Sequence, residues 1–132
     1  VASGGEISRL MLSLKALIAH AMALPSIVFD EVDTGVSGEI ADKMAGIMRE
    51  MAECMQVISI THLPQVASLG QTHYRVYKSD TETSTATHLI KLSEKERIEE
   101  IARMLSGSSL TAAALDNARE LLKRNDMKDA KK

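Results

Sequence analysis

Three groups of residues in this chain have side chains or backbone that could act on a phosphorylated substrate. The run 3–5 is Ser-Gly-Gly at the start of a helical pattern, and bare amides at a helix start bind anions. Asp30 and Glu31 end an apolar, β-branched segment, where carboxylates can hold Mg²⁺ or activate a water. His62 ends a second apolar segment. Together the groups predict two halves of a nucleoside-triphosphate site.

Each group also has a purely structural explanation. Ser3 could simply cap a helix, the two carboxylates could form a turn, and His62 could be a satisfied histidine at a sheet edge. The adjacency of Asp30 and Glu31 supports the functional interpretation, because neighbouring residues at a strand end point in opposite directions. Asp30 could then face a metal while Glu31 faces a water.

Other reactive side chains give weaker signals. His20, His73 and His88 are interpreted as surface or packing residues, and Cys54 as a small packing residue. A zinc site at Asp30, Glu31 and His62 would lack a further ligand at useful spacing.

Composition sets broad limits on the class of protein. The chain has 132 residues, is 45% hydrophobic and 26% charged, and can build one domain with a core. Its net charge of −2 gives no overall basic footprint for nucleic acid. The single cysteine excludes a disulfide within the chain and fits a reducing compartment. No apolar run approaches the roughly 20 residues of a membrane span.

Apolar spacing and capping signals predict the order of elements. Strands alternate with helices over the first 72 residues, which favours a mainly parallel α/β sheet. We expect helices over 6–23, 39–54, 64–70, 93–105 and 110–124, strands over 26–30, 56–61, 73–78 and 85–92, a loop over 32–38 and a polar turn over 79–84.

The first predicted helix carries a continuous apolar stripe. Ser3 with Glu6, and Ser93 with Glu96, fit the capping-box pattern at two helix starts. Gly107 can end the helix that Ser93 opens. The stripe of the first helix consists of Ile7, Leu10, Met11, Leu14, Leu17, Ile18 and Ala21.

The order of these motifs resembles the second half of an ABC-type ATPase head. In that family a signature motif, a Walker B motif, a D-loop and a switch histidine follow one another. The longer runs 1–9, 29–38 and 61–67 are similar to the SMC-like members that act in DNA repair, and the resemblance extends to about residue 124. The motifs correspond to Ser3-Gly4-Gly5-Glu6, Asp30-Glu31, Asp33 and His62.

The resemblance implies a role for each of these residues. Asp30 would support Mg²⁺ indirectly, Glu31 would deprotonate the attacking water, and His62 would sense the γ-phosphate of ATP. Asp33 would couple two ATP sites in a head–head dimer. The signature residues Ser3, Gly4, Gly5 and Glu6 would bind the ATP held by the partner head. Phosphoryl transfer needs such positioning and charge stabilisation more than covalent help.

One family element is absent: no Gly-x-x-x-x-Gly-Lys-Ser/Thr occurs in the 132 residues. The resemblance therefore implies a partial P-loop NTPase head of ABC/SMC type that lacks the P-loop half. The start inside a motif suggests a fragment. Residues 1–92 would be the C-terminal half of the head, 93–125 helices of the same domain, and 126–132 a flexible tail.

The resemblance also implies partners, cofactors and a location. The cofactors would be ATP and Mg²⁺, and the full-length parent would hydrolyse ATP while this fragment alone would be inactive. The partners would be the N-terminal part of the same head, a second head in an ATP-dependent homodimer, and DNA through the full-length protein. The protein would act in double-strand-break repair, in the cytoplasm at the nucleoid, without a membrane.

Two other classes of function stay open at this point. A metal-dependent nuclease or topoisomerase-like domain could use Asp30, Glu31 and Asp33 as ligands, although it leaves the run 3–5 and His62 unexplained. A non-catalytic dimerisation module could use the same motifs as a contact surface.

The missing half predicts a gap in the sheet. In the resembled fold, the strand before the P-loop lies between the strand ending near His62 and the strand at 73–78. Its absence would leave rows of unpaired amides and carbonyls, so the fragment would rearrange, pair with another copy or stay partly molten. Of these outcomes, self-association is favoured because the apolar strands make good edges for pairing.

Overall fold

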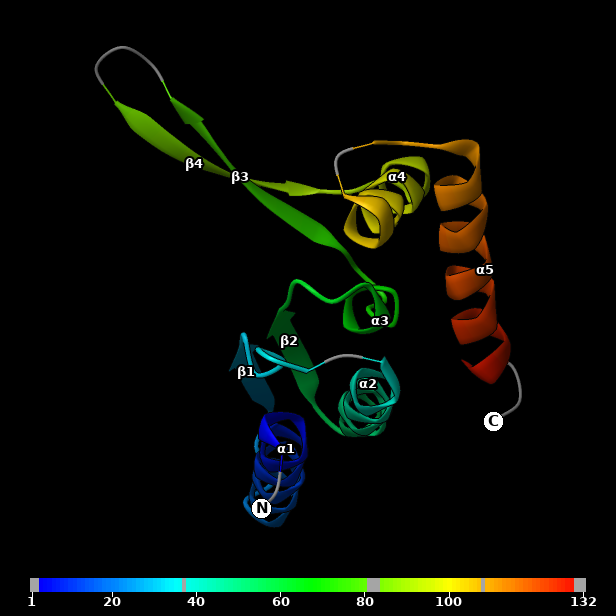
Figure 1. Cartoon of the computed structure of the whole chain (residues 1–132). Helices are drawn as coiled ribbons and strands as arrows, with labels where there is room; N and C mark the ends of the chain where they lie inside the picture. Colours follow the sequence, from blue (N-terminus) through cyan, green and yellow to red (C-terminus); the bar gives the residue numbers. More distant parts are fainter. Residues whose placement is uncertain (1–2, 37, 81–83, 108, 130–132) are drawn as a thin grey trace. The chain divides into compact units, whose positions relative to one another are not determined.

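The chain divides into two units, residues 1–69 and residues 70–132 (Figure 1). The computed structural model describes residues 3–36, 38–80, 84–107 and 109–129. Parts of three predicted segments lie outside the described residues. They are Ser37 in the loop 32–38, residues 81–83 in the polar turn and residues 130–132 of the tail.

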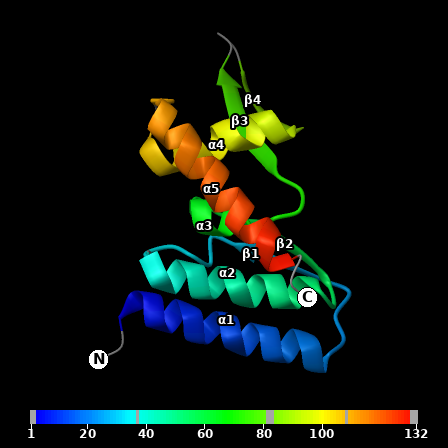
Figure 2. The ribbon, with the colours of Figure 1, turned by 90° about the vertical axis from the view of Figure 1, so that its right-hand side faces the viewer.

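The first unit contains the predicted parallel strands. It runs α1 (Gly4–Ala21), β1 (Ser26–Asp30), α2 (Gly38–Ala52), β2 (Gln56–Ile60) and α3 (Pro64–Ala67). The two strands pair in parallel from Ser26 opposite Gln56 to Asp30 opposite Ile60. Helices α1 and α2 lie side by side, as both views show (Figures 1 and 2). This β1–α2–β2 crossover sets the carboxyl ends of both strands at one edge.

The core of the first unit lies against one face of the strand pair. Phe29 of β1, Leu12 of α1 and Met44 of α2 are almost completely buried there. Met48 and Met51 of α2 are also buried.

The outer apolar surfaces of this unit are exposed. The predicted stripe of α1 is not the face that packs: Leu10 is 67% and Leu17 70% exposed, whereas Leu12 and Ala19 are buried. On the strand pair, the exposed side chains of Val28, Ile58 and Ile60 alternate with buried or partly buried ones. A parallel strand pair with one bare apolar face is typical of a sheet that is covered on both sides.

The second unit is an antiparallel hairpin followed by two helices. Strands β3 (Tyr74–Asp80) and β4 (Thr85–Lys91) pair in register from Tyr74 opposite Lys91 to Asp80 opposite Thr85. Helix α4 (Glu94–Ser106) packs against α5 (Ala112–Asp129). The side chains of Ile101, Ala102 and Ala118 are completely buried.

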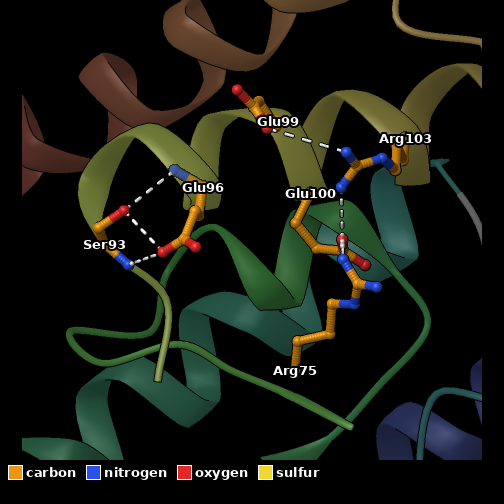
Figure 3. A network of polar contacts seen from close by, with 6 residues as sticks. All are labelled: Arg75, Ser93, Glu96, Glu99, Glu100 and Arg103. Carbon is orange, nitrogen blue, oxygen red and sulfur yellow. Dashed lines mark hydrogen bonds and ion pairs between the residues drawn. The ribbon is translucent and has the colours of Figure 1, made fainter. Parts of the chain in front are cut away.

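Charged side chains connect the hairpin to α4 (Figure 3). Glu100 accepts from Arg103 at 3.2 Å on the same helix and pairs with Arg75 of β3 at 3.5 Å. Arg103 also reaches Glu99 at 3.8 Å. These contacts lie within the second unit and explain part of its cohesion.

Two predicted boundaries differ from the structure. The hairpin, grouped in the sequence with residues 1–92, belongs to the unit with α4 and α5 because β1–β2 and β3–β4 form separate two-stranded sheets. Helix α5 continues to Asp129, beyond the predicted end near 124, so the first part of the predicted tail is helical.

Candidate functional site

The carboxyl edge of the strand pair brings the predicted catalytic groups together. Asp30 is opposite Ile60, and the backbone N–H of Glu31 donates to the Ile60 carbonyl at 3.0 Å, extending the ladder by one bond. His62 follows two residues after Ile60. Since Asp30, Glu31 and His62 are all exposed at this edge, they can reach a common ligand.

Glu31 adopts an unusual backbone conformation. Its φ is 46°, in the left-handed region that residues other than glycine rarely adopt. Its carbonyl accepts from the amide of Thr34 at 3.2 Å and from the Thr34 hydroxyl at 2.9 Å. Such strained residues cluster at functional sites, where the surrounding structure holds them. The turn therefore fixes Glu31 directly after the strand.

Asp33 lies inside the same turn and contacts the end of the next strand. Its side chain is 1% exposed. The Thr61 hydroxyl donates to Asp33 Oδ2, and His62 Nδ1 lies 3.8 Å from Asp33 Oδ1. The loop after β1 is thus attached to the residues that follow β2. Thr61 is the site residue that the sequence reasoning missed, and the only signal was a hydroxyl directly before His62.

The start of α1 has the capping box predicted from its sequence. Ser3 Oγ accepts from the Glu6 amide at 3.3 Å, while the Ser3 amide donates to Glu6 Oε2 at 2.8 Å. The hydrogen bond from the Ser3 backbone, followed by that from its side chain, lowers the pKa of Glu6 below its usual range. Other first-turn amides have no acceptor within a helix, so they remain able to meet an anion.

The two glycines at this helix start differ in their surroundings. A Cβ built on Gly5 would lie 3.2 Å from Ile40 Cδ1, so Gly5 lets α1 pack closely on the first turn of α2. Gly4 is exposed and has nothing within 4 Å of a built Cβ. Gly5 therefore has a packing role of its own, whereas Gly4 is free for an approaching ligand or partner.

The acidic residues do not form a protein-only metal site. Within the described residues, no group of three His, Cys, Asp or Glu side chains could hold a metal ion. Buried Asp33, engaged with Thr61, does not extend toward a metal shared with Asp30. The burial of Asp33 disfavours the nuclease alternative, which uses Asp33 as a metal ligand. A single exposed carboxylate fits Mg²⁺, which usually takes one or two carboxylates together with phosphates and waters.

The remaining reactive side chains mostly have the structural roles expected. His88 is bonded to Ser79 Oγ at 2.7 Å and stacks on Tyr77 with ring centroids 5.0 Å apart. His20 is exposed and His73 is partly buried. Cys54 is exposed, so its interpretation as a packing residue was wrong.

The fold agrees with the class that the motifs suggest. No family model matches the chain. A solved chain, reported under "structural biochemistry of ATP-driven dimerization and DNA stimulated activation of SMC ATPases", matches with a TM-score of 0.65 and 18% identity. The match covers 82% of this chain and 65% of that chain. The chain therefore has the fold of part of an SMC-type ATPase head.

Within this class the chain is similar in sequence to bacterial DNA repair protein RecN. It is 47% identical to the protein from Rickettsia conorii and 44% identical to that from Vibrio cholerae, each over 92% of this chain. The chain spans about a fifth of the length of these relatives, 22% in both. None of the helices among the described residues is long and apolar enough to cross a membrane.

Proposed function

We propose that this chain is the C-terminal portion of an ATP-hydrolysing head in a RecN-like DNA repair protein. The observation that carries the proposal is the convergence of Asp30, Glu31 and His62 at one edge of the parallel strand pair. Ligands of parallel α/β sheets bind at the carboxyl ends of the strands, which is where these side chains lie.

Each of the converging side chains has a distinct task in hydrolysis. Glu31 would take the proton of the attacking water, Asp30 would support Mg²⁺ indirectly, and His62 would meet the γ-phosphate. When bound, Mg²⁺ neutralises charge on the phosphates. The φ of 46° at Glu31 supports this division, because it turns the residue out of the strand direction that Asp30 follows.

The start of α1 acts on the nucleotide of a second head. Ser3, Gly4 and Gly5 present a hydroxyl and amides to the partner's ATP, and the capping box between Ser3 and Glu6 keeps this turn in shape. The empty space beside Gly4 supports close approach. The turn containing Asp33 would couple the two sites from within the head, since the Asp33 side chain contacts Thr61 of its own chain.

The isolated chain binds ATP weakly and does not hydrolyse it. The 132 residues contain no P-loop, the element that supplies most phosphate contacts in P-loop NTPases. The N-terminal part of the same head would provide that loop and cover the exposed apolar faces of α1 and of the strand pair. Without that part, the bare strand edges favour self-association.

The biological setting follows from the relatives' name and is part of the proposal. The full-length parent would act in recombinational repair of DNA double-strand breaks, in the cytoplasm at the nucleoid. It would dimerise through its heads with ATP and Mg²⁺ bound and would contact DNA through regions outside this chain.

Replacement of Glu31 in the full-length parent tests the proposal. Glu31→Gln should keep ATP binding but lower the rate of hydrolysis on the order of 10²-fold or more, because an amide cannot take the proton of water. Nucleotide affinity and single-turnover hydrolysis would be measured side by side. Glu50→Gln, an exposed glutamate on α2, is the matched control and should leave both unchanged. Near-normal hydrolysis in Glu31→Gln would show that Glu31 is not the base.

A further inference from the structure

The Asp33 carboxylate is buried although one of its oxygens has no hydrogen bond. The side chain is 1% exposed, and Oδ1 is a buried atom without a hydrogen-bond partner. Burying an ionisable group is costly unless it is paired, so an unpaired oxygen of this kind calls for a nearby donor. His62 Nδ1 lies 3.8 Å from this oxygen, too far for a hydrogen bond.

Thr61 holds the other oxygen of this carboxylate and shapes the backbone around His62. Its hydroxyl donates to Asp33 Oδ2 and accepts from the Leu63 amide at 3.0 Å. One hydroxyl thus links the turn after β1 to the residues on both sides of His62. This short-range bond pattern fixes the local backbone, as threonine does in many turns.

The His62 ring is the exposed member of this group. Its side chain is 58% exposed, so the ring can rotate toward Asp33 without displacing core atoms. A movement of about 1 Å would bring Nδ1 into hydrogen-bond range of Oδ1. A hydrogen bond at Nδ1 determines which ring nitrogen is left for a ligand, and here that nitrogen is Nε2.

We propose that Asp33 and Thr61 are positioning residues that orient His62, so that its Nε2 faces the γ-phosphate. The inference rests on the proposed function of His62 and deepens it. Asp33 accepts from Nδ1–H, and Thr61 keeps the carboxylate aligned for that bond. Because Asp33 lies two residues after Glu31, the same contact links the turn that holds the base to the residue that senses the phosphate.

Isosteric substitutions in the full-length parent separate positioning from packing. Thr61→Val keeps the shape of the side chain but removes the hydroxyl, and Asp33→Asn keeps an acceptor for Thr61 but loses the carboxylate. Both should lower kcat for ATP hydrolysis roughly 10- to 100-fold, the scale of a misplaced catalytic group, with KM for ATP within about twofold. Thr61→Ser keeps the hydroxyl and should restore kcat to within about threefold.

A hydroxyl on β2, two residues before Thr61, provides the matched control. Ser59 Oγ is buried and has no hydrogen-bond partner in the described structure. Ser59→Ala should therefore leave kcat unchanged. If Thr61→Val fails to fold, Asp33→Asn and Thr61→Ser still test whether the contact positions His62, because both variants keep a polar group there.

His62→Ala distinguishes failure of this inference from failure of the proposed function. If His62→Ala lowers kcat but Asp33→Asn and Thr61→Val do not, the positioning role is refuted and the site stands. If His62→Ala has no effect, the role of His62 itself is refuted. Equal loss of kcat in Thr61→Ser and Thr61→Val would also overturn the inference, because the hydroxyl would then not be the cause.

Discussion

The same capping box opens a helix in each unit of this molecule, and the two boxes have different neighbours. In both, the serine amide donates to Oε2 of the glutamate at 2.8 Å, and the return bond is 3.3 Å at Glu6 and 3.4 Å at Glu96. The same bonds lower the pKa of both glutamates. The same capping hydrogen bonds therefore form part of a candidate site at the start of α1, whereas at the start of α4 they only cap the helix.

The helices that follow these boxes also differ in what they leave exposed. Helix α1 exposes a stripe of leucine, isoleucine and methionine. Helix α4 carries Glu99, Glu100 and Arg103, which pair with one another and with the hairpin (Figure 3). The exposed apolar surface of the first unit is therefore suited to contact with another protein segment, whereas the charged surface of α4 is suited to solvent. Four predictions test this difference between the two units.

The largest effect is expected from the inner face of α1. Leu12→Ala should lower the free energy of unfolding by about 2–5 kcal/mol, because Leu12 is fully buried and the deletion leaves a cavity. Leu10→Ala on the exposed stripe is the control and should change it by less than about 0.5 kcal/mol. Chemical denaturation of the 132-residue chain measures both. Similar costs for the two variants would mean that the stripe is buried in solution.

The next effect concerns Gly4 and its proposed action in trans. Gly4→Leu should leave ATP binding to its own subunit intact and lower hydrolysis by the parent on the order of 10²-fold, since the new side chain blocks the approach to the partner's phosphate. The open space at Gly4 means that the fold accommodates the change.

Mixed dimers provide the control for this substitution. Combining the Gly4→Leu subunit with one that cannot bind ATP leaves one intact composite site, so part of the activity should return. Absence of any rescue, once mixed dimers are shown to form, would exclude an intersubunit role for Gly4.

A smaller effect compares the two capping boxes directly. Ser3→Ala and Ser93→Ala should each cost about 1 kcal/mol of stability through loss of the cap. Only Ser3→Ala should also lower ATP hydrolysis in the full-length parent. Parallel unfolding and activity measurements check this. Equal loss of activity in both variants would show that the effect of Ser3 is structural.

The smallest effect is a pH dependence centred on the second unit. Burial, with a further contribution from Arg97, lowers the pKa of His73 below its ordinary value of 6.5. The unfolded chain therefore binds more protons between the folded pKa and 6.5, so stability is full above this window and falls as pH decreases through it. His73→Gln should remove this loss.

The measurement is the unfolding midpoint over a pH series that crosses this window. The exposed His20 gives the control, because His20→Gln should keep the wild-type dependence. A wild-type midpoint that rises as pH falls would reverse the predicted sign.

Much of the fold could be predicted from local signals. Both capping boxes, the parallel strands ending at Asp30 and near His62, and the hairpin agree with the structure because each depends on residues close in sequence. The class of ATPase head followed from the motif order and is supported by the structural match. Helix ends were less accurate, and α5 continues to Asp129 because its charged last turns still favour helix.

The sequence alone identified the residues that could do chemistry and the element on which each lies. Tertiary packing determined which face of α1 is buried, because Leu12, rather than the more continuous stripe, meets the core. It also decided that Asp33 turns inward to Thr61 and His62. The contact joins residues 28 positions apart in the chain, and no local pattern specifies a hydrogen bond over that separation.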